Sequence, residues 1–134
     1  MTACIFCRIV RGDLPSYVVA ESDRAIAFLD IQPAELGHTL VVPRAHAANL
    51  DEISLDDLQA CAELAKRIAA SVRSALKTDG VSIVQSNGVA AGQTVFHYHV
   101  HIIPRYDGDA LRSMWTPGEA SAEELARVAD QLQA

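Results

Sequence analysis

The chain has 134 residues and a mass of 14.4 kDa, which suits one domain with its own core. Its 11 Lys and Arg against 17 Asp and Glu give a net charge of −6, which argues against a protein that grips a nucleic-acid polymer through a basic face. Hydrophobic residues make up 50% of the chain, which excludes a disordered protein, and no apolar run reaches the roughly 20 residues of a membrane helix.

The N-terminal residues, Met1-Thr2-Ala3-Cys4, lack the basic and apolar stretches of a secretory signal. The three cysteines are an odd number, which favours thiols or metal ligands over a disulfide framework. We therefore expect a cytoplasmic protein with a single domain over residues 1–134, and no membrane or nucleic-acid polymer as a partner.

The predicted elements begin with a short helix over Ile5–Val10. The clearest helix covers Leu55–Leu76, because apolar residues recur there every three or four positions. A further helix is expected over Ala122–Leu132, where Ser121 and Glu124 form a capping box. Runs rich in β-branched residues predict five strands: Tyr17–Glu21, Ala25–Leu29, His38–Pro43, Val81–Gln85 and Thr94–Ile103.

The order of these elements lacks the regular alternation of a doubly wound fold. Strands instead cluster on both sides of one long helix. We therefore predict an α+β fold with a largely antiparallel five-stranded sheet, one long helix and a C-terminal helix.

Three of the five histidines, His97, His99 and His101, lie in the last predicted strand. Because side chains alternate along a strand, the three imidazoles should share one presented face. Neighbours on that face are about 6.5–7 Å apart, too far for all three to bind one zinc ion comfortably. The row then indicates nucleophilic catalysis, with one imidazole attacking and its neighbours binding an anion or moving protons, or simply a solvated strand face.

A loop of small residues, Asn87–Thr94, precedes the histidines. Such a loop can approach a phosphate closely through its backbone N–H groups, although most glycine-containing loops are ordinary turns. Next to a histidine row, it favours a phosphate held beside an imidazole.

The run His97-Tyr98-His99-Val100-His101-Ile102-Ile103 resembles the His-φ-His-φ-His-φ-φ motif of the histidine triad (HIT) family of nucleotide hydrolases and transferases. The resemblance extends over nearly the whole chain. It includes the family's base-pocket segment at Ile5-Phe6 and Ile9, its ribose-binding segment at Phe28–Ile31 with Pro33, the run Gly37–Pro43, and the phosphate loop with Asn87 and Gly92–Val95.

The resemblance implies that His99 attacks the α-phosphorus of a nucleotide and forms a nucleotidyl-imidazole that water cleaves. His101 would bind the phosphoryl oxygens, supported by His38. The implied phosphate contacts are Asn87, Gly92, Gln93 and Thr94, and Asp30 would accept the ribose hydroxyls. Phe6, Ile9, Phe28 and Ile31 would form the apolar slot for the base, although each could equally be a core residue.

Within the family, Asn87 and the run Met114–Gly118 resemble the HINT-like (histidine triad nucleotide-binding) branch, which hydrolyses purine nucleoside phosphoramidates and aminoacyl-adenylates. Thr116 departs from the Trp-Pro-Pro-Gly pattern of that branch. Ala91–Val95 and Pro104-Arg105 are shared with the dinucleoside polyphosphate hydrolases. A dinucleoside polyphosphate hydrolase or phosphorylase of the same family therefore remains an alternative. A nucleotide-binding protein without turnover is a second alternative, and a metal-storage or structural role is a third.

The pair Cys4-x-x-Cys7 is ambiguous between redox and zinc chemistry. Many bacterial members of the family hold a structural zinc with such a pair and two histidines, whose positions His46 and His97 match. Two buried thiols with a surface His46 are the alternative. We expect structural Zn²⁺ and no redox cofactor, and Cys61 is expected to be a small core residue.

The resemblance also implies a symmetric homodimer, in which the long helix and a central strand pack across a two-fold axis and extend the sheet. The sequence is compatible with this arrangement, because Val81–Val84 would otherwise form an unprotected edge strand.

Overall fold

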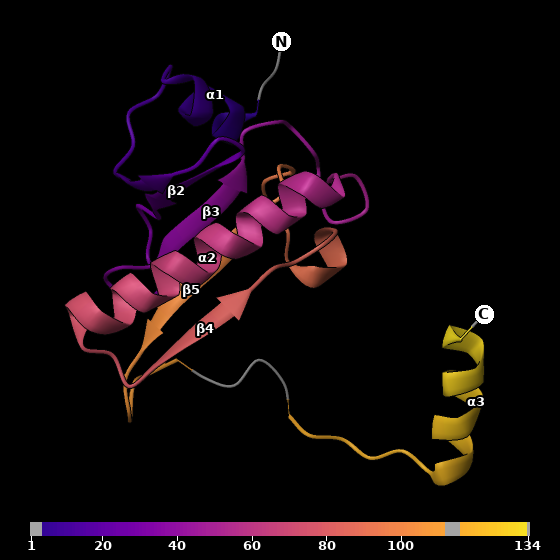
Figure 1. Ribbon diagram of the computed structural model, residues 1–134. Coiled ribbons are helices and arrows are strands. Elements are labelled where there is room, and N and C mark those ends of the chain that lie inside the picture. Colours follow the sequence, from indigo (N-terminus) through magenta and orange to yellow (C-terminus); the bar gives the residue numbers. More distant parts are fainter. Residues whose placement is uncertain (1–3, 112–115, 134) are drawn as a thin grey trace.

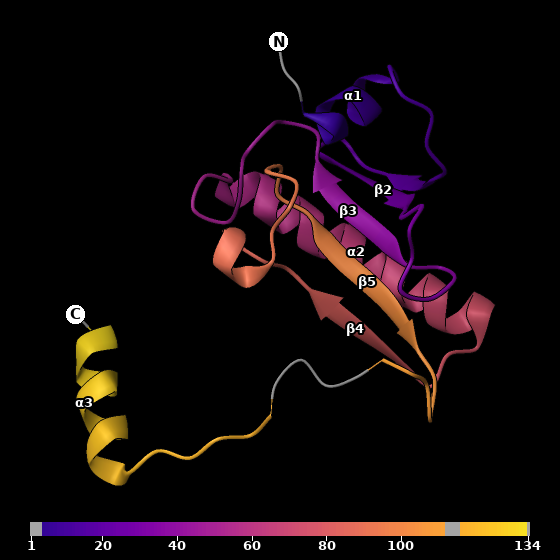
Figure 2. The same ribbon diagram turned by 180° about the vertical axis from the view of Figure 1, so that it is seen from behind.

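The computed structural model describes residues 4–111 and 116–133 (Figures 1 and 2). Met114 and Trp115 of the predicted C-terminal motif lie outside the described residues. In chain order the elements are α1 (Ile5–Arg11), β1 (Val18–Glu21), β2 (Ala25–Leu29), β3 (Thr39–Pro43), α2 (Leu55–Leu76), β4 (Gly80–Val84), a 3₁₀ turn (Val89–Ala91), β5 (Val100–Arg105) and α3 (Ala122–Leu132).

The five strands form one sheet in the order β1-β2-β3-β5-β4, and every neighbouring pair is antiparallel. This confirms the predicted α+β architecture. Strand β5 therefore lies inside the sheet, and β4 lies at its edge. Helix α2 connects β3 to β4 and crosses one face of the sheet (Figure 1).

The two faces of the sheet carry separate cores. On the α2 face, Val41, Val100 and Ile102 pack against buried side chains of the helix, including Leu64 and Ile68. On the opposite face, a smaller cluster joins α1 to β2 and β3: Phe6, Ile26, Phe28, Leu40 and Val42. Because side chains alternate along β5, His101, Ile103 and Arg105 lie on the side away from α2. The candidate site therefore lies on the α1 side of the sheet.

The last predicted strand is wrong in its bounds, since β5 begins at Val100 and not at Thr94. Gly92 adopts a φ of +92°, and the N–H of Tyr98 donates to the carbonyl of Ala47 at 2.7 Å. This bond ties the segment before β5 to the loop between β3 and α2. The prediction that three histidines form one presented row is also wrong, because His97 is 0% exposed.

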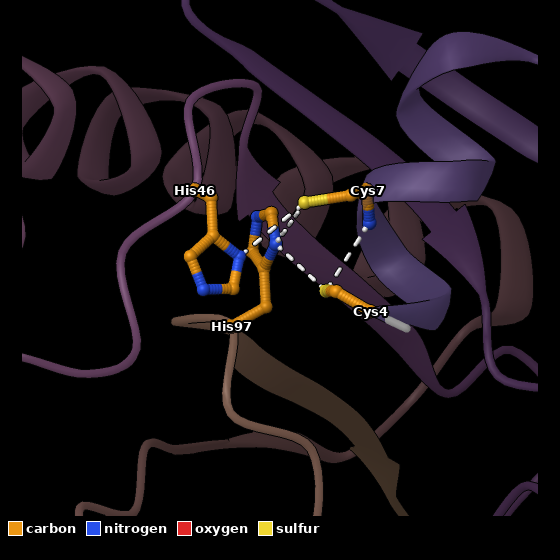
Figure 3. Close-up of side chains that lie close together, drawn as sticks. All are labelled: Cys4, Cys7, His46 and His97. Carbon is orange, nitrogen blue, oxygen red and sulfur yellow. Dashed lines mark hydrogen bonds between the residues drawn. The ribbon is translucent and has the colours of Figure 1, made fainter. Parts of the chain in front are cut away.

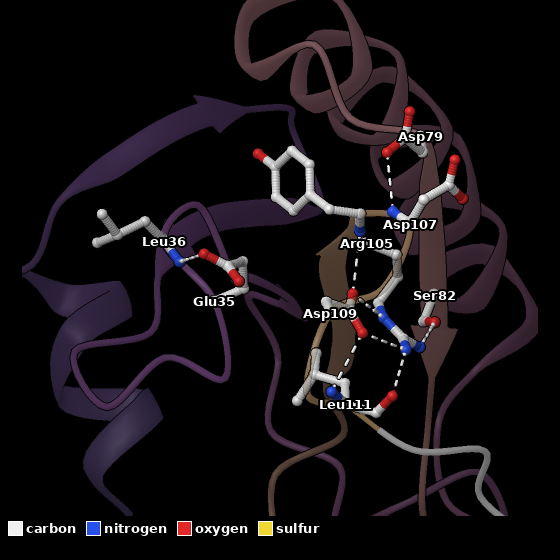
Figure 4. Close-up of polar contacts among 9 residues, drawn as sticks. Glu35, Leu36, Asp79, Ser82, Arg105, Asp107, Asp109 and Leu111 are labelled. Carbon is white, nitrogen blue, oxygen red and sulfur yellow. Dashed lines mark hydrogen bonds and ion pairs between the residues drawn. The ribbon is translucent and has the colours of Figure 1, made fainter.

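The loop after β5 is fastened by Arg105 (Figure 4). Its Nε and Nη2 donate to the two carboxylate oxygens of Asp109 at 2.9 and 3.0 Å, and Nη1 donates to Ser82 Oγ at 3.0 Å. Nη2 also donates to the carbonyl of Leu111 at 2.9 Å. The guanidinium strongly lowers the pKa of Asp109, so the pair stays ionised and holds the chain against the end of β4 and β5.

Helix α3 begins with the predicted capping box between Ser121 and Glu124. Its apolar residues Leu125, Val128 and Leu132 lie on one side of the helix, and all three are exposed. None of the helices in the described part of the chain is long and apolar enough to cross a membrane.

Candidate functional site

Three histidines form a cluster on the α1 side of the sheet. His101 belongs to β5, His99 precedes that strand, and His38 precedes β3, which is paired with β5. The ring centroids of His99 and His101 are 4.9 Å apart, and those of His38 and His101 are 5.2 Å apart. The structure thus brings together the three residues that the sequence suggested for catalysis.

The hydrogen bond of His99 determines which of its ring nitrogens can react. Nδ1 lies 2.7 Å from the carbonyl oxygen of His97. A carbonyl only accepts, so Nδ1 carries the proton and Nε2 keeps its lone pair. The side chain is 8% exposed, and this burial lowers the pKa of His99, which keeps the imidazole neutral near pH 7. A neutral imidazole with an available Nε2 is a competent nucleophile.

A second chain of hydrogen bonds fixes the protons of His38 and His101. The backbone N–H of Ala34 donates to His38 Nδ1 at 3.0 Å, so the proton of His38 is on Nε2. That Nε2 lies 3.0 Å from His101 Nδ1 and donates to it. His101 therefore carries its own proton on Nε2, where it can donate to an oxygen of a bound anion. Burial and the neighbouring His99 and His38 lower the pKa of His101 to about 4.

Asp30 completes this end of the site. Its Oδ2 lies 3.6 Å from His38 Nε2, and its Oδ1 accepts from the backbone N–H of Gln32 at 2.8 Å. Donor atoms of Asp30, His38 and His101 lie close enough together to suggest a metal site. Ligation through His38 Nε2 would require that nitrogen to lose its proton, which would leave the Ala34 N–H without its acceptor. The cluster is therefore better suited to an anion and ribose hydroxyls than to a cation.

The four residues of the expected base slot differ in position. Phe6 and Phe28 are 7% and 2% exposed and pack edge to face, with ring centroids 5.5 Å apart. Ile9 is half-buried beside them, and Ile31 is 80% exposed. Phe6 also packs edge-on against His99, with centroids 5.1 Å apart. The two phenylalanines thus belong to the core behind His99, while Ile31 lies on the surface.

A hollow of about 330 Å³ opens beside His38 and His101 on the same face of the sheet. Its walls come from the loop before β3, from β4 and β5, and from the chain after β5. The further lining residues are Ala34, Ser82, Val84, Ile103, Arg105 and Leu111. Space for a small ligand is therefore present next to the paired imidazoles.

The loop over residues 87–94 is held closed by Gln93, whose side chain is buried. Gln93 Oε1 accepts from the N–H of Gly88 at 2.8 Å, and Nε2 donates to the carbonyls of Ala48 and Val95 at 2.7 and 3.1 Å. The backbone N–H groups of Gly92 and Gln93 donate within the same turn, to Val89 and Gly88. The polar groups of Gly92 and Gln93, both expected to contact a phosphate, therefore take part in closing the loop.

The remaining two residues of the expected phosphate loop are exposed. Thr94 lines a second hollow of about 370 Å³ with Cys4 and Ile5 at the start of α1. Asn87 lies at the other end of the loop, and its Oδ1 accepts from the backbone N–H of Leu50 at 2.8 Å. Asn87 and Thr94 therefore lie on either side of the Gly88–Gln93 hydrogen bond that closes the loop.

Four side chains from three segments form a Cys/His cluster (Figure 3). Cys4 and Cys7 lie at the start of α1, His46 follows β3, and His97 precedes β5. His97 Nε2 donates to the carbonyl of Pro43 at 2.8 Å, so its Nδ1 lone pair faces the two sulfurs at 3.4 and 3.5 Å. His46 Nδ1 lies 3.3 Å from Cys7 Sγ.

This geometry fits zinc. The bond lengths of zinc to sulfur and nitrogen give a tetrahedron whose S···N edges are roughly 3.6 Å, near the separations observed here. Burial lowers the pKa of His97 and keeps its imidazole neutral. The pKa of the Cys7 thiol is raised, first by burial and then by the neighbouring Cys4. A bound cation would reverse this rise in the pKa of Cys7. Two thiolates and two imidazoles complete a closed, structural type of site.

Several groups that fix these histidines are main-chain atoms: the N–H of Ala34 and the carbonyls of Pro43 and His97. Sequence analysis missed all three because backbone groups leave no mark on residue type. It also missed Gln85, whose side chain bonds to Asn87.

Comparison with known proteins gives consistent results. The family model described as "HIT domain" matches residues 11–108. The chain is 38% identical over 131 residues to adenosine 5′-monophosphoramidase HNT1 of Saccharomyces cerevisiae, covering 97% of this chain and 80% of that protein.

Two solved structures are similar over almost the whole chain. A protein from Streptococcus mutans UA159 matches with a TM-score of 0.94 and 39% identity, covering 99% of this chain and 85% of that one. A Zn-bound histidine triad family protein from Mycobacterium smegmatis matches with a TM-score of 0.79 and 38% identity, covering 98% and 96%. With the triad geometry described above, these similarities show that the chain belongs to the histidine triad (HIT) family and resembles its HINT-like branch.

Proposed function

We propose that the protein is a nucleotide hydrolase that cleaves purine nucleoside 5′-phosphoramidates, such as adenosine 5′-phosphoramidate, and also aminoacyl-AMP, to AMP. The observation that carries the proposal is the hydrogen bond from His99 Nδ1 to the His97 carbonyl, which leaves Nε2 of a neutral imidazole free to attack. The similarity to a yeast protein named adenosine 5′-monophosphoramidase supports this substrate class.

In the first step, His99 Nε2 attacks the α-phosphorus, and the bond to the leaving group breaks: the P–N bond of a phosphoramidate, or the P–O bond of aminoacyl-AMP. The electron pair of that bond stays on the leaving atom; a leaving nitrogen takes a proton from water and departs as an amine, and a leaving carboxylate departs as the anion. The imidazole then carries a positive charge, which the Nδ1–H bond to the His97 carbonyl stabilises. In the second step, water attacks the phosphorus and its oxygen becomes part of AMP. The N–P bond breaks, its electron pair returns to Nε2 and restores neutral His99, and a proton of the attacking water is released to solvent.

The neighbouring residues take supporting roles in this proposal. His101 donates from Nε2 to a phosphoryl oxygen, and His38 keeps His101 in the tautomer that permits this. Asn87 and Thr94 contact the phosphoryl group, and Asp30 accepts the ribose hydroxyls. The base lies against the apolar surface near Ile9 and Ile31, behind which Phe6 and Phe28 form the core.

The features shared with dinucleoside polyphosphate hydrolases do not favour those substrates. Gln93 closes its loop, and Arg105 binds Asp109, Ser82 and Leu111. In this chain the polar groups of both residues are used in contacts within the fold. They therefore carry no information about the leaving group.

We also propose that Cys4, Cys7, His46 and His97 hold a structural Zn²⁺. The distances among their donor atoms support this, as does the zinc-bound relative from Mycobacterium smegmatis. When bound, the ion would tie α1 to the segment before β5. It would supply no reacting group, because a closed set of four protein ligands leaves no open position.

We further propose a homodimer of a single HIT domain over residues 1–134. The exposed apolar face of α3 and the exposed Ile83 on edge strand β4 support an assembly that covers them.

The experiment is a competition between adenosine 5′-phosphoramidate and diadenosine tetraphosphate at equal concentration, with AMP release followed by chromatography. Faster loss of the phosphoramidate, abolished in His99→Ala, is expected. Faster loss of the polyphosphate would overturn the substrate class. Tight nucleotide binding without AMP release would instead identify a binding protein.

A further inference from the structure

The amide side chains of Gln85 and Asn87 form a reciprocal pair. Gln85 Nε2 donates to Asn87 Oδ1 at 2.8 Å, and Asn87 Nδ2 donates to Gln85 Oε1 at 2.9 Å. The backbone N–H of Leu50 donates to the same Asn87 Oδ1 at 2.8 Å. An exposed asparagine is thus held by three hydrogen bonds from two segments.

These bonds fix the orientation of both amides. The Leu50 N–H can only donate, so the Asn87 atom facing it is the oxygen. Gln85 Nε2 also donates to the carbonyl of Ser86 at 3.2 Å, which identifies that atom as the nitrogen. Asn87 then retains one Nδ2 hydrogen for which the described part of the chain provides no acceptor.

The position of the pair relates it to the reacting histidine. Strand β4 ends at Val84, which is paired with His101. The segment 85–87 therefore leaves the sheet beside the start of β5, where His99 lies. The bond from the Gly88 N–H to Gln93 Oε1 closes the loop immediately after Asn87 and brings it back near Thr94.

We propose that Gln85 is a positioning residue for catalysis: it turns the Asn87 amide so that the remaining Nδ2–H donates to the phosphoryl group of the substrate. Without Gln85, the Asn87 amide would keep its Leu50 bond but could rotate away from that direction. This inference rests on the proposed function, because it assigns the group that Asn87 serves.

Gln85→Glu provides a test with a pH signature. A protonated glutamate donates to Asn87 Oδ1 and accepts from Nδ2, as the glutamine does, whereas an ionised glutamate can only accept and would repel Oδ1. We expect the kcat/KM of Gln85→Glu, divided by that of the wild type, to approach one near pH 4. The pKa of a free glutamate is about 4.3, and the neighbouring Asn87 Oδ1 should raise it. Above that pKa the ratio should fall about tenfold.

Gln59→Glu is the matched control, because it makes the same charge change at an exposed position of α2, the helix on the opposite face of the sheet. Its ratio to the wild type should stay near one at every pH. Thermal melting of each variant separates loss of fold from loss of function. A flat ratio for Gln85→Glu across pH would overturn the positioning role.

A double-mutant cycle gives a second test. If Gln85 acts through Asn87, Gln85→Leu combined with Asn87→Ala should lose no more activity than Asn87→Ala alone. Losses that multiply would show that Gln85 acts independently and would overturn the proposal.

Measuring the dissociation constant of AMP distinguishes a failure of the positioning role from a failure of the proposed function. If the wild type hydrolyses no phosphoramidate, the proposed function fails, and the AMP dissociation constants of the same variants decide the positioning role. A pH-dependent loss of AMP affinity in Gln85→Glu would support it, and pH-independent affinity would contradict it.

Discussion

His97 and His99 are two residues apart and use the same device with opposite ring nitrogens. Each donates one ring N–H to a main-chain carbonyl: His97 from Nε2 to Pro43, and His99 from Nδ1 to His97. The other nitrogen keeps its lone pair, which faces two sulfurs in His97 and is free to attack in His99. The choice of nitrogen, set by backbone geometry, gives one histidine the features of a metal ligand and the other those of a nucleophile.

The largest effect should come from removing each of these two histidines in turn. His99→Ala should lower turnover about 10³-fold or more, because it removes the proposed nucleophile, while zinc content and melting temperature stay near those of the wild type. His97→Ala should instead lose zinc. Parallel measurements of AMP release and bound metal check both variants. Zinc loss in His99→Ala would contradict the division between the two sites.

Removing the metal should affect stability most strongly. Chelation, or Cys4→Ser, should lower the free energy of unfolding by about 4 kcal/mol when zinc is at about 1,000 times its Kd, because the ion binds the folded chain alone. Urea unfolding with and without chelator measures the change. Cys61→Ser is the matched thiol control for metal content, since Cys61 lies in the α2 core, and it should keep its zinc.

The neutral histidines of the His38–His99–His101 cluster should make the fold sensitive to acid. The pKa of His101 is about 4 in the folded chain, beside His99, His38 and Asp30, and about 6.5 when unfolded. Below pH 6.5 the unfolded chain binds more protons, so stability falls as pH decreases. The loss from His101 should reach about 3 kcal/mol at pH 4. Urea unfolding of the wild type and of His101→Gln, above pH 6.5 and at pH 4, measures this loss of stability. If His101→Gln loses as much stability at pH 4 as the wild type does, other groups cause the loss.

The smallest of these effects should come from a substitution that disturbs the His38–His99–His101 cluster but leaves the Cys/His cluster intact. It changes neither a proposed metal ligand nor the proposed nucleophile. Gly37 has a φ of +99°, and a Cβ there would collide with Leu76 and press on Pro104. Gly37→Ala should therefore cost about 1–3 kcal/mol of stability and disturb His38, the next residue.

Turnover of Gly37→Ala should fall while its zinc content is retained, as measured by activity and metal analysis. The control is Gly12→Ala: Gly12 also has a positive φ, but nothing lies near its Cβ. A loss of zinc in Gly37→Ala would show that the two clusters are not independent.

Much of the architecture could be predicted from residue type. The three- and four-residue spacing of apolar residues predicted α2, and the β-branched runs predicted all five strands. The resemblance to the HIT family brought His38, His99 and His101 together, and likewise Cys4 with Cys7, His46 and His97.

What could not be predicted depends on long-range backbone contacts. The bond from Tyr98 N to the Ala47 carbonyl shortens β5 and buries His97, and the closed turn uses the N–H groups of Gly92 and Gln93. The tautomers of His38 and His97 depend on Ala34 and Pro43, whose backbone atoms any residue type supplies.

The most direct test is to locate the covalent intermediate. The wild type is mixed with adenosine 5′-phosphoramidate, quenched within milliseconds in alkali, where a phosphorylated imidazole survives, and digested for peptide mass spectrometry. We expect AMP attached to His99 and to neither His97 nor His101. AMP attached to another residue, or rapid AMP release with no adduct at any time, would contradict it.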